Sequence, residues 1–130
     1  MRFQFIRLFS ALLLVVGVST FSYAAELESA AAQKILSLAE KGEASAQELL
    51  GGIYFLGEGT KKDYVKAKEW YEKAAEQDYA KAQTNLGMMY SDGLGVRKDY
   101  VKAKEWFSKA CENGEQNSCA EYNRLIRQGF

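Results

Sequence analysis

Cys111 and Cys119 carry the most reactive side chains of this sequence, since two thiols can form a disulfide or act in redox chemistry. On one continuous helix their Cα atoms would lie about 12 Å apart, whereas a disulfide needs them within about 7 Å. Asn113-Gly114 lies between them and is a strong helix-stop signal. A chain reversal there would bring the cysteines together, so we predict a disulfide. A reactive thiol is the competing interpretation, although no C-x-x-C motif is present.

Several well-known catalytic and ligand-binding motifs are missing from the sequence. It contains no histidine, which removes Ser-His and Cys-His nucleophile systems and most zinc sites. The Ser-x-x-Lys spacing of serine β-lactamases does not occur, and no Gly-Lys-Ser/Thr follows the glycine pairs as in a phosphate-binding loop. Acidic residues are scattered among lysines at helical spacing, as on a solvated surface. We therefore predict no catalytic residue, no metal site and no cofactor, and expect that the protein is not an enzyme.

Residues 1–24 have the pattern of a cleaved signal peptide. Arg2 and Arg7 precede an apolar run over Leu8–Val18. In Ser22-Tyr23-Ala24, small residues stand at positions −3 and −1 relative to the expected cleavage site after Ala24. The run is shorter than the roughly 20 residues of a membrane-spanning helix, although an uncleaved anchor is the alternative. Cleavage near Ala24 would make the protein periplasmic or secreted, in a compartment where disulfides persist.

The charge balance limits the choice of partners. The sequence holds 17 basic and 17 acidic residues, so loss of Arg2 and Arg7 leaves a small acidic excess. No basic surplus is available to neutralise phosphates, and nucleic acid is therefore not expected as a partner. After signal cleavage we expect no membrane association, and a single small domain that is a monomer.

The elements that must position these residues come from an internal repeat. The segment KDYVKAKEW occurs at 62–70 and again at 98–106, an offset of 36 residues. Such a period predicts stacked supersecondary units that bury their apolar faces against one another. Apolar residues within each unit recur at helical spacing, so each unit reads as helix A, a glycine-containing loop and helix B. Gly57 and Gly93 are expected to end helix A, and Asp63 and Asp99 to cap helix B.

A set of residue types recurs at equivalent positions of the two units. In helix B the small alanines allow close helix approach, while Trp70 and Trp106 are expected to fill the space between units; ligand stacking on these tryptophans is the alternative. The recurring residues are Ala46, Leu50, Gly51, Tyr54, Gly57, Gly59, Asp63, Ala67, Trp70, Tyr71 and Ala74, then Ala82, Leu86, Gly87, Tyr90, Gly93, Gly95, Asp99, Ala103, Trp106, Phe107 and Ala110.

These motifs resemble the Sel-one-like repeat family, a relative of the tetratricopeptide repeat. The resemblance implies an all-α fold, a short right-handed α-solenoid of antiparallel helix pairs with about six helices in the mature chain. It divides the chain into an N-terminal capping helix at 25–45, repeats at 46–81 and 82–117, and a C-terminal half repeat at 118–130. It also implies a protein-binding role as an adaptor, a regulator or an inhibitor, one version being a periplasmic immunity protein against a toxic effector.

The C-x7-C spacing resembles the cysteine-rich secreted branch of this family, where it forms a disulfide. This chain has the cysteine pair at one junction only; Ala75 and Gln83 stand at the earlier equivalent positions. Some cysteine-rich relatives bind penicillin or have weak β-lactamase-like activity. A penicillin- or peptidoglycan-binding protein is therefore the alternative function.

The positions of helix A that face away from its core differ between the units, although the scaffold is repeated. In helical-repeat solenoids the A helices line the concave side, where partners bind. The alternative is that exposed positions have simply drifted, or that Leu49 and Phe55 cover the capping helix. The predicted contacts with a partner protein are Leu49, Phe55, Leu56, Asn85, Met88, Ser91, Asp92 and Arg124.

Overall fold

The computed structural model describes residues 29–130, and this part of the chain is helical without strands. Residues 29–34 belong to one compact unit and residues 35–130 to a second, whose fold is given below. A helix over residues 29–40 precedes α2 (Ala44–Leu56), α3 (Tyr64–Ala75), α4 (Ala80–Asp92), α5 (Tyr100–Glu112) and α6 (Gln116–Arg127). The predicted all-α solenoid is confirmed. The predicted signal peptide lies outside the described residues.

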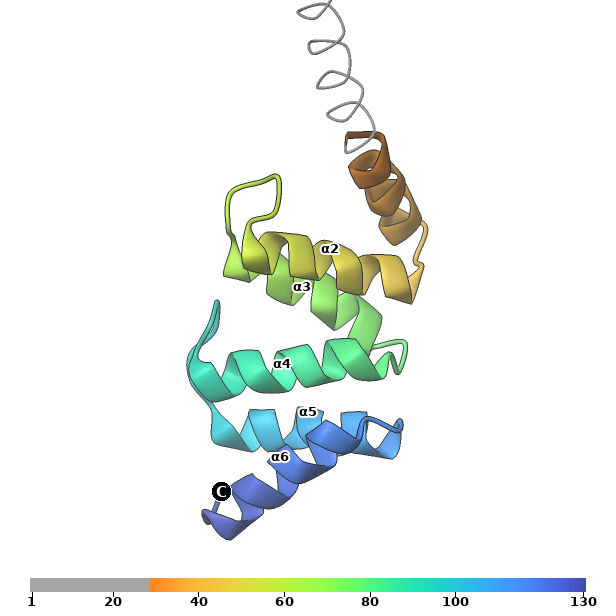
Figure 1. The fold of residues 1–130 in the computed structure, drawn as a ribbon. Helices are drawn as coiled ribbons and strands as arrows, with labels where there is room; N and C mark the ends of the chain where they lie inside the picture. Colours follow the sequence, from red (N-terminus) through yellow and green to blue (C-terminus); the bar gives the residue numbers. More distant parts are fainter. Residues whose placement is uncertain (1–28) are drawn as a thin grey trace, which may run out of the picture. The chain divides into compact units, whose positions relative to one another are not determined.

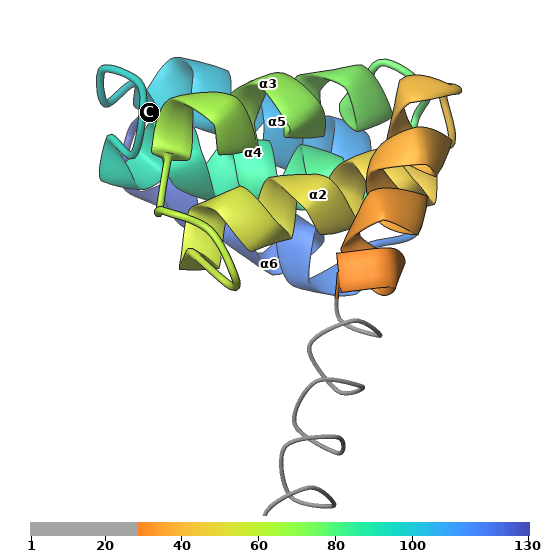
Figure 2. The ribbon, with the colours of Figure 1, turned by 90° about the horizontal axis from the view of Figure 1, so that it is seen from above.

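The helices α2 to α6 stack in chain order. Each of them packs against the next one along the chain, from α2 on α3 to α5 on α6 (Figure 1). Helices α2, α4 and α6 are the A helices of successive units, whereas α3 and α5 are the B helices, as the view in Figure 2 shows. Such stacking gives each unit contacts mainly with its neighbours, as expected of a solenoid.

The predicted helix ends are present in both repeats. Gly57 and Gly93 follow α2 and α4 with φ angles of 74° and 70°, and their N–H groups donate to the carbonyl oxygens of Ile53 and Met89. These φ values lie in the left-handed region, which glycine tolerates best. The side chains of Asp63 and Asp99 each accept a hydrogen bond of 3.0 Å from the third backbone N–H that follows. Each cap stabilises the start of helix B by about 1 kcal/mol.

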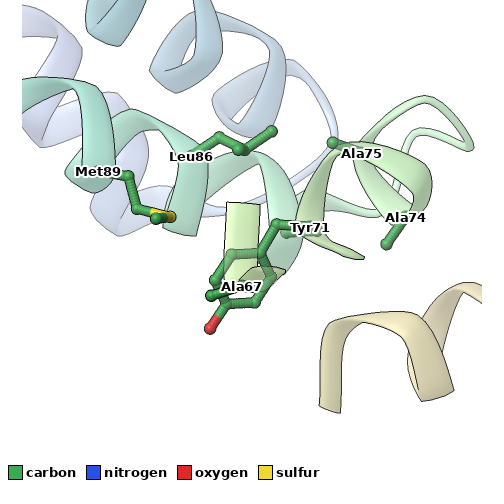
Figure 3. Packing of buried hydrophobic residues seen from close by; sticks show 7 residues of the cluster. Ala67, Tyr71, Ala74, Ala75, Leu86 and Met89 are labelled. Atoms are coloured by element: carbon green, nitrogen blue, oxygen red, sulfur yellow. The ribbon is translucent and has the colours of Figure 1, made fainter. Parts of the chain in front are cut away.

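The core between the repeats consists of alanines and a few large side chains. Tyr71 of α3 lies among Leu86 and Met89 of α4, with the small alanines of both helices around them (Figure 3). Similar clusters form at each end of the stack, around Leu50 and around Phe107 with Leu125. Buried alanines let the helices approach closely, so the large side chains fill the remaining space.

The two tryptophans are less buried than the sequence suggested. Trp70 packs at the edge of the cluster around Leu50, and Trp106 packs at the edge of the cluster around Tyr71. Both are nevertheless only half-buried. The ammonium groups of Lys73 and Lys109 lie 4.0 and 4.6 Å from the ring centroids, respectively. The neighbouring aromatic residues are the buried ones, because the helical turn points positions 71 and 107 inward.

The repeated Leu-Gly pair of helix A has a steric cause. A Cβ atom added to Gly51 would lie 2.6 Å from the ring of Tyr71, and one added to Gly87 would lie 2.6 Å from the ring of Phe107. Real Cβ atoms do not approach other atoms so closely. Glycine at these positions therefore lets the aromatic ring of helix B lie directly on the backbone of helix A.

Candidate functional site

The A helices expose one row of side chains at equivalent positions, spaced i, i+3 and i+7. We call this row the helix A face. In α2 the row is apolar, in α4 it is mixed, and in α6 it is polar and charged. Its members are Leu49, Gly52, Leu56, Asn85, Met88, Asp92, Glu121, Arg124 and Gln128.

Three apolar members of the helix A face are exposed to solvent. Leu49 is 53 %, Leu56 59 % and Met88 44 % accessible. Leu49 and Leu56 lie two turns apart on α2, and Met88 stands at the position of α4 that is equivalent to Gly52. Because glycine has no side chain, α2 has no counterpart to the exposed side chain of Met88.

Side-chain hydrogen bonds join neighbouring A helices along this face. The amide Nδ2 of Asn85 donates to Glu48 Oε1 at 3.2 Å, which connects α4 to α2. The hydroxyl groups of Thr84 and Ser118 lie 2.7 Å apart, which connects α4 to α6. These hydrogen bonds link the three A helices in chain order, in part through the buried Ser118. Satisfied polar contacts of this kind also fix the positions of the side chains beside them.

At the charged end of the helix A face, side chains of the same segment hold Arg124 in place. Arg124 Nε lies 2.8 Å from Glu121 Oε2, and its Nη1 donates to Gln128 Oε1 at 3.1 Å. In the described part of the chain Asp92 takes part in neither of the two ion pairs that form. The face thus passes from exposed leucines on α2 to an oriented guanidinium on α6.

The predicted partner contacts differ in exposure. Leu49, Leu56, Met88 and Asp92 are exposed, whereas Phe55, Asn85 and Arg124 are half-buried. The prediction for Ser91 is corrected, because this side chain is buried and only 7 % accessible. Ser91 and its equivalent Phe55 stand where helix A turns toward helix B. Accordingly the ring of Phe55 packs 5.0 Å from that of Tyr64.

The two cysteines form the predicted disulfide at the junction between α5 and α6. Their Cα atoms lie 4.7 Å apart, because the chain reverses at Asn113 and Gly114. The glycine has a φ of 96°, which allows this reversal. The bonded cysteines leave no free thiol within residues 29–130, so the interpretation as a reactive thiol loses its support.

The same positions of the two earlier junctions hold an alanine and a buried glutamine. Gln47 Nε2 donates to the carbonyl oxygen of Ala39 at 3.1 Å, and Gln83 Nε2 donates to that of Ala75 at 3.2 Å. The sequence comparison aligned Ala75 and Gln83 with the cysteines but missed these hydrogen bonds. Each glutamine connects the end of one helix B to the following helix A, as the disulfide does.

The side-chain oxygen of each glutamine accepts a hydrogen bond from an amide side chain of the next junction. Gln77 Nε2 donates to Gln47 Oε1, and Asn113 Nδ2 donates to Gln83 Oε1, both at 2.9 Å. No buried side-chain nitrogen or oxygen within the described residues lacks a hydrogen-bond partner. The units are therefore linked by a row of amides as well as by apolar packing.

Two side chains have shifted pKa values, and burial or an ion pair within the fold causes each shift. Burial raises the pKa of Tyr71 to about 12, and the nearby Glu48 carboxylate acts in the same direction. A hydrogen bond to Glu72 raises the pKa of Lys68, which pairs with that carboxylate at 2.8 Å. The described residues do not gather three or more side chains of the types that ligate metals. None of the helices within 29–130 has the length and apolar character needed to cross a membrane.

The repeated helix pair with its glycine loop defines a helical-repeat protein. The family model of the Sel1 repeat matches residues 44–79 and 80–115, so the chain belongs to the Sel1 repeat family. Repeats of this family generally mediate interactions between proteins. Comparison with curated protein sequences gives no match.

Solved structures of Sel1-like repeat (SLR) proteins are similar to this chain. A Sel1 repeat protein from Oxalobacter formigenes is 40% identical with a TM-score of 0.73, over 76% of this chain and 41% of that one. The protective antigen c5321 of uropathogenic Escherichia coli, which has an SLR fold, is 38% identical with a TM-score of 0.74, over 77% and 21%. Helicobacter pylori cysteine-rich protein B is 29% identical with a TM-score of 0.69, over 72% and 70%. The chain thus spans less than half the length of the first two.

Proposed function

We propose that this protein is an exported binding module without catalytic activity, which holds a partner protein on its helix A face. Family membership supports the general role, since Sel1 repeats mediate interactions between proteins. The proposal of export rests on the signal-peptide pattern of residues 1–24 and on the disulfide, which is typical of exported proteins.

The observation that carries the choice of surface is the exposed apolar group on α2 and α4. Leu49, Leu56 and Met88 are each about half exposed, although they lie on rigid helices beside polar residues. Apolar side chains bordered by polar groups are typical of protein-binding surfaces. The oriented Arg124 at the other end of the face would set the direction of a bound segment.

An inhibitor of another exported protein is the more specific form of this proposal. The described residues expose one apolar group on the A helices, which would suit contact with a single partner. An immunity protein against a toxic effector would be one example. The proposal of β-lactam or peptidoglycan binding rests on family resemblance alone, and turnover of nitrocefin by the purified protein would revive it.

A pulldown from periplasmic extract tests the choice of surface. The bait is the whole protein, compared with a Leu56→Asp/Met88→Asp variant. The matched control is Val65→Asp/Val101→Asp, because these valines of α3 and α5 are each 55 % accessible and lie on the B helices. We expect a protein that the wild type and the control retain and the helix A variant loses. Equal retention by all three baits would overturn the assignment to the helix A face.

A further inference from the structure

A cavity of about 550 Å³ lies at the loop between α4 and α5, and none of its lining residues belongs to the helix A face. The end of α4, the loop itself and the first turn of α5 all contribute to it. Its lining residues are Tyr90, Val96, Arg97, Lys98, Asp99 and Lys102. Three of these carry a positive charge and one a negative charge.

The single carboxylate of the cavity already has a structural role. Asp99 Oδ1 accepts a hydrogen bond of 3.0 Å from the backbone N–H of Lys102 and so caps α5. The two ion pairs formed within residues 29–130 involve none of the three basic side chains. The ammonium groups of Lys98 and Lys102 instead lie 5.8 and 5.5 Å from the ring centroids of Tyr100 and Tyr90. An aromatic ring attracts a cation without neutralising its charge.

The wall of the cavity is held in place by the fold. Tyr90 packs against the cluster around Phe107, and its carbonyl oxygen accepts the backbone N–H of Asp99 at 2.9 Å. The loop also rests on the preceding unit, because a Cβ added to Gly95 would lie 2.6 Å from the carbonyl oxygen of Tyr64. A site that is already formed loses little conformational entropy on binding.

We propose that this cavity binds an acidic segment of a partner protein. The guanidinium of Arg97 matches a carboxylate in bidentate geometry, and the two ammonium groups add charge around it. Val96 and the ring of Tyr90 offer contacts for an apolar side chain next to the carboxylate. Because the whole sequence has as many acidic as basic residues, this local charge suits a short acidic segment better than an extended polyanion such as nucleic acid.

The first repeat supplies a control with three basic residues at the same positions, although Glu58 stands there in place of Leu94. There Lys61, Lys62 and Lys66 occupy the equivalent positions, and Lys66 lies 5.2 Å from the ring centroid of Tyr54. Thr60 and Lys61 stand in place of Val96 and Arg97. The two loops therefore differ in the planar guanidinium, in the apolar wall and in the carboxylate of Glu58, whereas their positive charges correspond. General electrostatic attraction would act on the corresponding basic side chains of both loops.

The experiment measures binding of a fluorescein-labelled peptide of alternating Glu and Val to the whole protein by fluorescence anisotropy. We expect binding that weakens with added salt, a loss of about tenfold in Arg97→Ala, and less than about twofold in Lys61→Ala. Both side chains are exposed, so neither variant should change the fold. The amide signals of Val96 and Lys102 should shift on titration, while those of Leu56 and Met88 should not.

Two results would overturn the proposal. One is an equal loss in the Lys61→Ala and Arg97→Ala variants, which would indicate general attraction. The other is stronger binding of inorganic tripolyphosphate or of phosphatidylglycerol vesicles than of the peptide. None of the residues that line the cavity belongs to the helix A face, so this test does not depend on the outcome of the pulldown.

Discussion

The inner junction between α3 and α4 and the terminal junction between α5 and α6 connect equivalent helices by different means. At the inner junction Gln83, fully buried, donates to Ala75 and accepts from Asn113. At the terminal junction a disulfide joins the same two positions. The backbone turns match, since Tyr79 N–H donates to Ala74 and Glu115 N–H donates to Ala110.

The difference shows what each connection needs from its surroundings. A buried glutamine is stable only when both its donor and its acceptor are satisfied, and the acceptor is satisfied by an amide from the next junction. After α6 the described residues contain no further junction that would supply such an amide. A disulfide requires no partner beyond its own two residues. The predictions below test this comparison in order of decreasing effect.

Removal of the disulfide should have the largest effect. We expect the Cys111→Ala/Cys119→Ala variant to lose about 2–3 kcal/mol of unfolding free energy, as for a short closed loop. Hydrogen exchange should quicken chiefly in α6, because the earlier helices are packed on both sides. Thermal melting and exchange measurements check this. A uniform increase in exchange across α2 to α5 would contradict the view that the bridge serves only the terminal junction.

The second largest loss of stability should come from adding a methyl group to helix A where a ring of helix B packs on it. Gly87→Ala would place a Cβ against the ring of Phe107 and should destabilise the fold by about 2 kcal/mol. The equivalent residue of α6, Asn123, is exposed, so Asn123→Ala should be neutral or slightly stabilising. Urea unfolding of both variants gives the measurement. A similar cost at both positions would mean that overpacking is not the cause.

Loss of the inner amide should cost somewhat less. In Gln83→Leu, the hydrogen bonds to Ala75 and from Asn113 are both lost, with an expected cost of about 1–2 kcal/mol. Chemical denaturation measures this cost. The additional substitution Asn113→Ala should then have almost no effect, because its partner is already gone. An additive effect of the two substitutions would show that Asn113 acts elsewhere.

Exchange of the terminal connection for the inner one should restore part of the stability. We expect Cys111→Ala/Cys119→Gln to be about 1 kcal/mol more stable than the variant with two alanines, through one hydrogen bond from the new glutamine to residue 111. It should remain below the wild type, because residues 29–130 supply no further amide to its acceptor oxygen. Thermal melting under reducing and oxidising conditions ranks the three proteins.

The smallest change in stability at neutral pH is expected for substitution of the aromatic ring that packs on helix A. Tyr71 and Phe107 are equivalent, and burial raises the pKa of Tyr71 to about 12 from an ordinary value of 10. The fold thus favours the neutral phenol, so this contribution is complete below pH 10 and is lost as the pH rises through 12. Tyr71→Phe should therefore lose less stability than the wild type between pH 10 and 12. Parallel pH curves would contradict this account.

Much of the fold follows from the sequence because its causes are local and repeated. The caps at Asp63 and Asp99 and the left-handed glycines at Gly57 and Gly93 depend on one residue each. Because those residues recur after 36 positions, their agreement with helix ends is not a chance match. The disulfide was also predictable, since a helix-stop signal stands between its cysteines.

The rest depends on contacts that one sequence does not reveal. Whether Trp70 or Tyr71 is buried depends on the rotation of α3 by about 100°, the angle between successive residues of a helix. The same uncertainty placed Ser91 on the surface, although it is buried. The amides of Gln77 and Asn113 meet residues 30 positions away, and no local pattern indicates this. The cavity at Arg97 likewise requires the loop to fold onto α4.

The disulfide also changes how the chain would carry tension. A force applied at Phe130 reaches Cys119 through α6 and then crosses directly to Cys111, so the segment 112–118 bears none of it. With about 3.5 Å of contour per residue, roughly 20 Å of chain stays hidden until the bridge is reduced. Pulled from its C-terminal end, the oxidised protein would therefore extend in a shorter step than the reduced one, and the next connection to yield would be the hydrogen-bonded junction at Gln83.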